Sequence, residues 1–283
     1  MRKRHGFTLT ELFVAIGAIA VLASLVVPVA SKARAAANAA SCLSNLHQMG
    51  SAFTMYELEY RSALVPYMWS SPNSQYPAYK HYWFGILDSY GVKADTLLCP
   101  SANTPIYSDP FSPIGLQTRG YGAVFNCWTG RFGPNGTAIT LTVPTRAQFG
   151  RDGDYRDGSY GYNRYLTAQF DGLGGFGSTR KTSNLLEIHD LANVPAFMDC
   201  VFGDVQPDNY SFAAPPKLPK DLTGMSAMPG TPGQNDLWKL LIARHGTAIN
   251  VGMADGSARL VPLTDLYMLT WNAGWQKYPL KIQ

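Results

Sequence analysis

Residues 6–31 read GFTLTELFVAIGAIAVLASLVVPVAS, and this stretch decides the architecture of the chain. Glu11 is its only charged side chain, and the run from Leu12 to Ser31 is uncharged. As an α-helix that run would be about 30 Å long, which matches the hydrocarbon thickness of a bilayer. An ionisable group inside such a segment costs roughly 2.5–3.5 kcal/mol at the centre of the membrane. We therefore expect Glu11 to have a specific partner.

The residues before this segment indicate its orientation. Arg2-Lys3-Arg4 precede the apolar run, and the positive-inside rule then leaves the amino end in the cytoplasm and sends the bulk of the chain outward. The alternative is a secretory signal peptide that is cut near Ala30 or Ala35. The apolar part of such peptides usually spans about 7–15 residues. Because this run is longer and contains a carboxylate, we expect a single membrane span.

The same residues resemble the amino terminus of type IV pilins and type II secretion pseudopilins. In those families a prepilin peptidase/methyltransferase cleaves after a glycine and methylates the new terminal phenylalanine, and a glutamate is the fifth residue of the mature chain. The resemblance implies cleavage between Gly6 and Phe7, which makes Glu11 the fifth residue. Glu11 would then neutralise the Phe7 amine of its own or a neighbouring subunit. Pro28 is expected to kink the helix, as pilins commonly carry a proline at about this depth.

An apolar stripe extends the helix beyond the membrane segment. Its members recur at spacings of three and four residues, which is typical of one helical face: Ala35, Ala39, Cys42, Leu46, Met49, Phe53 and Tyr56. We expect a leader over residues 1–6, a transmembrane half of the helix over 7–31, an amphipathic half over 32–60 and a globular head over 61–283. The expected fold class is α+β, a pilin-like lollipop whose long helix packs on an antiparallel β-sheet head with long loops.

Several stretches of the head have the length and residue types of strands. They are Gly120 to Asn126, Ser159 to Thr167, Ala196 to Phe202, Ala248 to Ala254 and Ser257 to Leu263. Short helices are expected from Tyr82 to Tyr90 and from Asp236 to Ala243. The proline-rich stretch between Gly203 and Asp236 predicts a long exposed loop.

Loss of the leader changes the charge of the chain. The full sequence holds 23 Lys and Arg residues against 19 Asp and Glu residues, and cleavage after Gly6 would remove Arg2, Lys3 and Arg4. The near-balance that remains, without a block of like charges, argues against nucleic acid as a partner. Hydrophobic residues make up 46% of the chain, which is enough for one globular head with a core of its own.

Four cysteines, Cys42, Cys99, Cys127 and Cys200, would face an oxidising compartment on this topology. Four cysteines allow three pairings. We favour Cys42 with Cys99, which would tie the helix to the head, and then Cys127 with Cys200; buried free thiols are the alternative. No two cysteines are close enough in sequence to form a C-x-x-C element, so we expect no zinc site and no other cofactor.

RHGTAINVGMADGS, residues 244–257, is the sharpest feature near the carboxyl terminus. Asp255-Gly256 between two apolar runs predicts a hairpin with a type I′ turn, which needs positive φ at both positions. His245 stands at the H-x9-DG spacing from this dipeptide. With the segments CLSNL from Cys42, CPS from Cys99 and SYGYN from Ser159, the motif resembles a family of pilin-like proteins that are described as prepilin-processing-associated.

His245 has a functional and a structural interpretation. As a catalytic base or metal ligand it would be oriented by Asp255, and as a structural residue it would be hydrogen-bonded at the start of a strand. The sequence contains no G-x-S-x-G elbow, H-E-x-x-H helix or P-loop to complete an active site. His189-Asp190 is equally isolated. We therefore favour the structural interpretation and expect no enzymatic activity.

One acidic stretch offers oxygen atoms that would suit calcium. Asp152, Asp154 and Asp157 lie in a glycine-rich segment, and some major pseudopilins hold calcium in a loop of the head. The spacing departs from the EF-hand pattern, and Arg151 and Arg156 would partly neutralise the site. A solvated turn is therefore favoured over a calcium site.

A cluster of aromatic residues follows the helix. Its members lie near prolines, where they suit either a platform for a sugar or protein ligand or the core: Tyr76, Tyr79, Tyr82, Trp83 and Phe84. Core packing is the favoured interpretation for most of them.

Together these features predict a structural protein of the pseudopilin type. It would sit in the inner membrane with its head periplasmic, or extracellular in a filament of the type II secretion or type IV pilus kind. Its partners would be the prepilin peptidase/methyltransferase, the inner membrane and sister subunits. The alternative is a membrane-tethered binding module whose head takes a surface polysaccharide or protein ligand. A third hypothesis is an enzyme that is released by signal-peptide cleavage.

Overall fold

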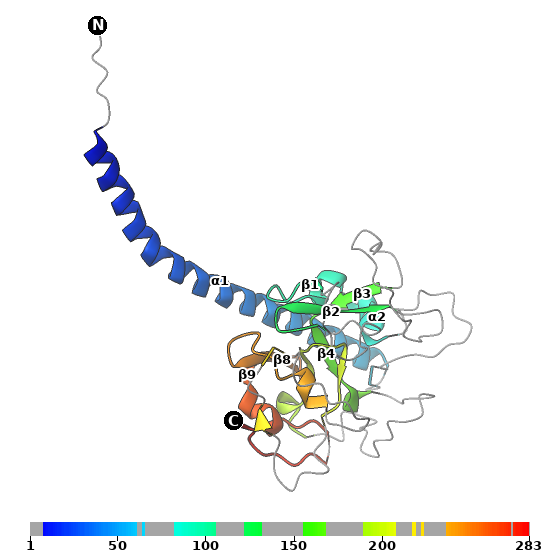
Figure 1. Ribbon diagram of the computed structural model, residues 1–283. Helices are drawn as coiled ribbons and strands as arrows, with labels where there is room; N and C mark the ends of the chain where they lie inside the picture. Colours follow the sequence, from blue (N-terminus) through cyan, green and yellow to red (C-terminus); the bar gives the residue numbers. More distant parts are fainter. Residues whose placement is uncertain are drawn as a thin grey trace.

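A computed structural model describes residues 8–60, 64–65, 82–105, 122–131, 155–167, 189–207, 217–218, 222–223, 236–272 and 274–282. One long helix leads into a head of short strands (Figure 1). Several residues singled out from the sequence lie outside the described ranges, namely Gly6, Phe7, Tyr76, Tyr79, Asp152 and Asp154.

The helix α1 spans Leu9–Glu59 without interruption. Its 51 residues make it about 77 Å long, close to the expected helix from Phe7 to Tyr60. Pro28 lies inside it, and the Ser31 Oγ donates to the Pro28 carbonyl at 2.9 Å. The helix bows smoothly along its projecting half (Figure 1), and it continues through Pro28 without interruption.

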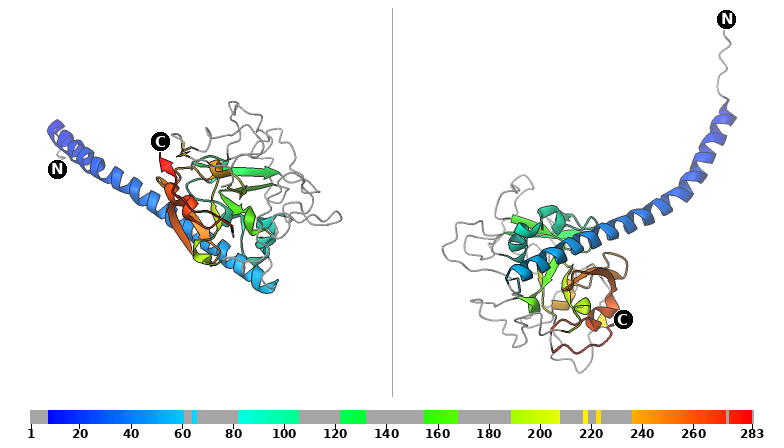
Figure 2. Two further views of the ribbon diagram at one scale, coloured as in Figure 1. Left: turned by 90° about the horizontal axis from the view of Figure 1, so that it is seen from below. Right: turned by 180° about the vertical axis from the view of Figure 1, so that it is seen from behind.

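The two halves of α1 differ in burial. Every residue from Leu9 to Ala37 is exposed, and this half projects away from the head (Figure 2). The helix is long and apolar enough to cross a membrane. The apolar stripe is buried from Cys42 to Tyr56, whereas Ala39 is half-buried and Ala35 is exposed. Burial therefore begins several residues after residue 32, where the amphipathic half was expected to start.

A five-stranded sheet forms the centre of the head. Its strands are β4 (Tyr160–Asn163), β5 (Pro195–Asp199), β6 (Asp204–Val205), β8 (Ala248–Met253) and β9 (Ala258–Pro262), in the order β6-β4-β5-β8-β9. All neighbours are antiparallel except β4 and β6, which are parallel. The sequence had predicted an antiparallel sheet. The parallel pair makes the sheet mixed instead.

Two smaller sheets contain the other strands of the described residues. β1 (Thr104–Pro105), β2 (Asn126–Arg131) and β3 (Tyr155–Gly158) form one of them, in which β1 is parallel to β2 and β3 is antiparallel to it. β7 (Lys217–Leu218) pairs with β10 (Lys281–Ile282) in the other. β6 and β7 lie inside the stretch that was expected to be only a loop.

Short helical turns connect these strands. α2 (Trp83–Leu87) continues into the 3-10 turn η2 (Asp88–Tyr90), which matches the short helix expected there. The helix expected from Asp236 is only the 3-10 turn η9 (Asp236–Lys239). The other 3-10 turns are η3 (Ala94–Leu97), η6 (Arg164–Leu166), η8 (Leu191–Asn193) and η10 (Leu263–Met268).

Four of the five expected strands have counterparts, and the fifth prediction was wrong. Residues 122–125 make a turn in which Ala123 and Asn126 exchange backbone hydrogen bonds, so the strand β2 begins only at Asn126. The strand expected over Ser159 to Thr167 is also shorter than predicted. β4 ends at Asn163, whose side-chain oxygen accepts from the Tyr165 N–H at 3.0 Å and starts η6.

The hydrophobic core lies on both faces of the central sheet. On one face α1 packs with Phe53 against Phe197, at 5.8 Å between ring centroids, and Trp83 lies 5.4 Å from the same Phe197 ring. Tyr82, Trp83 and Phe84 are all buried in this layer, so these three form core rather than a surface platform. On the other face, Ile249 and Val251 of β8 pack in one cluster with the aromatic residues of the carboxyl-terminal segment.

Candidate functional site

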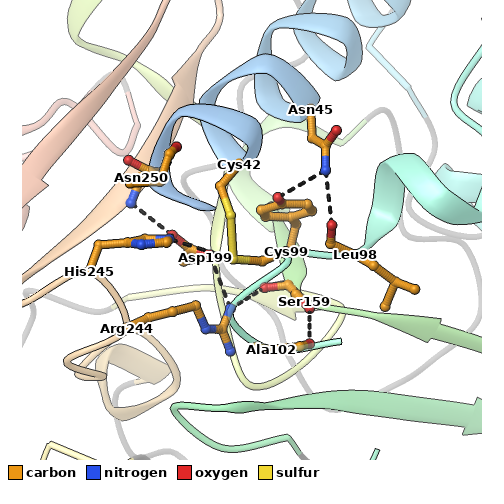
Figure 3. The surroundings of a disulfide bond; sticks show 12 residues. Cys42, Asn45, Leu98, Cys99, Ala102, Ser159, Asp199, Arg244, His245 and Asn250 are labelled. Atoms are coloured by element: carbon orange, nitrogen blue, oxygen red, sulfur yellow. Dashed lines mark hydrogen bonds and ion pairs between the residues drawn. A yellow bond between two sulfur atoms is a disulfide. The ribbon is translucent and has the colours of Figure 1, made fainter. Parts of the chain in front are cut away.

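The disulfide bond at the junction of α1 and the head joins Cys42 to Cys99 (Figure 3). Cys42 lies on the first buried turn of α1, and Cys99 lies in the corner after η3, where the Ala102 N–H donates to the Cys99 carbonyl at 2.8 Å. The two Cα atoms are 5.2 Å apart, and both side chains are buried. This is the pairing that the sequence favoured.

The second expected pairing, Cys127 with Cys200, is wrong. Both residues are buried thiols; Cys127 belongs to β2 of the smaller sheet, and Cys200 directly follows β5 of the central sheet. Burial raises the pKa of the Cys200 thiol to about 12. Cys200 is therefore protonated and poorly nucleophilic at neutral pH.

His245 lies against this disulfide. Its Nε2 atom is 3.5 Å from the Cys99 Sγ and 3.3 Å from the Asp199 Oδ2, and its side chain is 4% exposed. The backbone N–H of His245 donates to the Ala248 carbonyl at 3.3 Å, where β8 begins. The arrangement matches the favoured interpretation of a hydrogen-bonded histidine at a strand start, but the carboxylate beside it is Asp199 rather than Asp255.

Asp199, at the end of β5, is the charged centre of the junction, and no motif or spacing in the sequence indicated it. Its Oδ1 accepts from the Arg244 Nη1 at 3.1 Å, and its Oδ2 accepts from the Asn250 N–H at 2.8 Å. Burial alone would raise the pKa of Asp199, but hydrogen bonds and charge from His245 and Arg244 outweigh it and lower the pKa. Asp199 is therefore a buried carboxylate that stays ionised.

Arg244 forms an ion pair with Asp199, and its side chain is fully buried. Its guanidinium donates to the carbonyls of Ala123, Val124 and Ser159 at 3.0, 3.0 and 2.6 Å. A planar guanidinium with five donors can link several chain segments at one point. Arg244 thus holds the turn before β2, the start of β4 and the end of β5 together.

Polar contacts and a close backbone approach fix α1 to the same region. The Asn45 amide donates to the Leu98 carbonyl at 2.9 Å, and the Asn250 amide donates to the Ala39 carbonyl of α1 at 3.2 Å. Gly50 of α1 lies against Gly256 in the turn between β8 and β9. The two ends of the H-x9-DG motif therefore lie at two places where the helix meets the head, His245 beside the disulfide and Gly256 in the hairpin turn.

The hairpin turn differs in type from the prediction. Gly256 has φ +85°, but Asp255 does not have a positive φ, so the turn is not type I′. The Asp255 Oδ1 accepts from the Ser257 N–H at 2.9 Å and from the Ser257 hydroxyl at 2.6 Å. These local bonds keep Asp255 in an ordinary conformation and leave only Gly256 in the left-handed region.

Glu11 has a partner within its own first turn. Its Oε2 accepts from the Thr8 N–H and from the Thr8 Oγ1, both at 2.8 Å, and the Thr8 Oγ1 accepts from the Glu11 N–H at 3.3 Å. This is a capping box, and its T-x-x-E spacing is the sequence signal that would have indicated it. The exposed carboxylate is thus held beside the residue that follows Phe7.

Among the described residues, the remaining candidates do not gather into sites. Asp157 belongs to β3, where it pairs with Thr129 of β2. His189 and Asp190 are exposed, and the Asp190 carboxylate accepts from the Asn193 amide at 2.6 Å. By contrast, Cys42, Cys99, Asp199 and His245 bring potential ligand atoms within 4.8 Å of one another.

Comparison of the chain with protein-family models, characterised proteins and solved structures found no match.

Proposed function

We propose that the chain is a pilin-like structural subunit that is anchored in a membrane by the first half of α1 and assembles with sister subunits through that half. The observation that carries the proposal is the projecting apolar half itself. From Leu9 to Ala37 no residue of α1 is covered by the head, and large side chains such as Leu22 and Val29 are 62% and 67% exposed. Apolar surface on this scale is stable only in lipid or against other apolar helices.

Glu11 supplies the second support for the proposal. Cleavage after Gly6 would create an ammonium group on Phe7, the residue next to Thr8, whose N–H and hydroxyl already bind the Glu11 carboxylate. An ammonium at this point would compensate the charge of Glu11 within the membrane segment, of the same or a neighbouring subunit. Glu11 would thus select the correct axial position of one subunit beside the next.

Mass spectrometry of the chain from a host with a prepilin peptidase tests the processing step. We expect a mature chain that begins at Phe7 and carries one added methyl group. An amino terminus near Ser31 would instead identify a signal peptide and overturn the proposal.

Two substitutions at Glu11 separate its charge from its role as a helix cap. Glu11→Ala removes both, whereas Glu11→Gln retains an oxygen that can accept from the Thr8 N–H. We expect both variants to insert in the membrane and both to assemble poorly in cross-linking and sedimentation assays. Thr10→Ala, in the same exposed turn, is the matched control and should assemble normally.

The outcomes distinguish the alternatives. Normal assembly of Glu11→Gln would show that the charge is dispensable and would contradict the pairing with the Phe7 amine. A wild-type chain that stays monomeric in the membrane, and whose head is stabilised by a polysaccharide or protein ligand, would favour the tethered binding module instead.

A further inference from the structure

We propose that, when the Cys42–Cys99 bond is reduced, the side chains of Cys42, Cys99, His245 and Asp199 form a tetrahedral site for a zinc-type divalent metal. The four residues come from α1, the corner after η3, the segment before β8 and the end of β5. Their ligand atoms lie within 4.8 Å of one another, and the sulfur atoms and Asp199 are fully buried (Figure 3).

The distances in the disulfide form already approach those of a metal site. Zinc binds sulfur at about 2.3 Å and nitrogen or oxygen at about 2.0–2.2 Å, so tetrahedral angles place a sulfur and a nitrogen ligand about 3.5 Å apart and a nitrogen and an oxygen ligand about 3.4 Å apart. The Cys99 Sγ to His245 Nε2 distance is 3.5 Å, and the His245 Nε2 to Asp199 Oδ2 distance is 3.3 Å. The two bonded sulfur atoms must separate to about 3.8 Å, and the remaining pairs of ligand atoms, all within 4.8 Å, must close to about 3.5 Å.

The charges around the site also balance. A divalent metal with two thiolates and the Asp199 carboxylate has a net charge of minus one, and the buried Arg244 guanidinium on Asp199 returns the total to zero. A neutral total is the condition under which charges are tolerated in a protein interior. Arg244 occupies the Asp199 Oδ1, which leaves the Oδ2 facing His245 for the metal.

The outer contacts would hold the ligands in place. The Asn250 N–H donates to the Asp199 Oδ2 at 2.8 Å, and the backbone of His245 is fixed by its bond to Ala248. Such outer partners orient metal ligands and are worth about 10–100-fold in affinity. His245 would bind through Nε2 with its proton on Nδ1, and the two thiols would each release a proton on binding.

Disulfide and metal exclude each other at this site. A dithiol reductant supplies two electrons to the Cys42–Cys99 bond and ends as its own disulfide, which leaves two thiols for the metal. In the reverse direction, the two thiolates give two electrons to a small-molecule disulfide, the Cys42–Cys99 bond forms, two small thiolates leave, and the metal ion is released. One metal ion should therefore be released for each disulfide bond formed.

Titration of the full chain in detergent micelles tests the proposal. The chain is reduced, freed of reductant and of metal under argon, and titrated with Co²⁺ or with Zn²⁺ against a chromophoric competitor. We expect one equivalent per chain, a thiolate-to-cobalt absorption band with tetrahedral character, and no binding to the oxidised chain. Oxidised glutathione should release one zinc ion per disulfide formed.

Substitutions locate the site. Cys99→Ser and His245→Ala should weaken zinc binding by more than about 100-fold, since even outer partners are worth 10–100-fold. The double variant Cys127→Ser/Cys200→Ser keeps all four proposed ligands and should bind as the wild type does. Because the wild type is also tested in its reduced form, loss of the disulfide is common to every chain in the series.

Several results would overturn the proposal. They are the absence of the cobalt band in the reduced wild type, a band that survives His245→Ala, or a band that is lost in the Cys127/Cys200 double variant. Should the reduced chain lose its fold, one equivalent of zinc must restore its circular dichroism, and failure to do so is equally decisive against the site.

Discussion

Gly50 of α1 and Gly256 of the β8–β9 turn meet backbone to backbone. A Cβ atom on Gly50 would lie 2.9 Å from the Gly256 Cα and 3.3 Å from the Gly256 carbonyl oxygen. These are backbone atoms that cannot swing aside, so the helix can approach the turn this closely only because residue 50 is glycine. At Gly256 an added Cβ would meet only the Thr54 Oγ1, at 4.0 Å, and glycine is favoured there by its φ of +85°. Gly256 therefore both forms the turn and contacts the helix.

The substitution Gly50→Ala should destabilise the chain by about 1–3 kcal/mol, because the added methyl group must push the helix away from the turn. In an exposed helix the same change would stabilise by up to about 1 kcal/mol, so the sign of the effect is informative. Thermal unfolding of the detergent-solubilised chain measures it. Ser51→Ala, on the exposed face one residue further on, should change the melting temperature little, and an unchanged Gly50→Ala variant would contradict the close contact.

Arg244→Met should destabilise the chain by about 3–5 kcal/mol, because it leaves the buried Asp199 carboxylate and several carbonyl groups without their charged partner. Adding Asp199→Asn should restore part of that loss, which denaturant unfolding in a double-mutant cycle would reveal. Arg259→Ala is the control, since Arg259 is exposed and its change should stay within about 0.5 kcal/mol. Strictly additive effects at Arg244 and Asp199 would show that the two residues are not coupled.

Reduction of the Cys42–Cys99 bond in the presence of a chelator should lower the free energy of unfolding by about 4 kcal/mol. The two residues are 57 positions apart, and the loop-entropy relation gives this magnitude for a loop of that length. The Cys127→Ser/Cys200→Ser variant should show the same response to reductant, because neither residue contributes a disulfide. Non-reducing peptide mapping provides the direct check, and four free thiols in the native chain would contradict it.

The sequence predicted the parts of this structure that depend on local periodicity. The stripe from Cys42 to Tyr56 is buried as its spacing requires. The strands β8 and β9 lie where strands were predicted, on either side of the turn at Asp255-Gly256. Local spacing failed where long-range contacts decide. Ala35 fits the stripe but lies beyond the reach of the head. The apolar residues before Asn126 form a turn whose carbonyls, those of Ala123 and Val124, accept from the distant Arg244 guanidinium.

The candidate site was predicted only in outline. Cys42, Cys99 and His245 stood out by residue type and spacing, yet Asp199 and Arg244 did not, because an isolated acidic and an isolated basic residue look like surface positions in a sequence. Their burial depends on three segments that meet through the Arg244 guanidinium. Zinc patterns in a sequence rely on two cysteines that are close together. They therefore cannot detect the proposed site, whose four residues lie in four separate segments.

We expect Glu57, which is not part of the group around the disulfide, to make the stability of the chain depend on pH. It lies near the end of α1 on a half-buried position, and its Oε1 has no hydrogen-bond partner among the described residues. Burial raises the pKa of Glu57 from its ordinary 4.5 to about 8. The folded chain therefore keeps this proton over a range in which the unfolded chain has lost it.

Since the folded state binds more protons between pH 4.5 and 8, the free energy of unfolding should fall as the pH rises through this range. Glu57→Gln removes the titration and should stabilise the chain at pH 8 by about 1–2 kcal/mol, a figure reduced for the partial exposure of the side chain, with little effect at pH 5. Glu59→Gln is the control, because Glu59 is exposed and accepts a hydrogen bond from the Tyr90 hydroxyl at 2.6 Å. Chemical unfolding at several pH values measures both variants. A Glu57→Gln chain whose stability falls with pH as steeply as that of the wild type would show that another group causes the dependence.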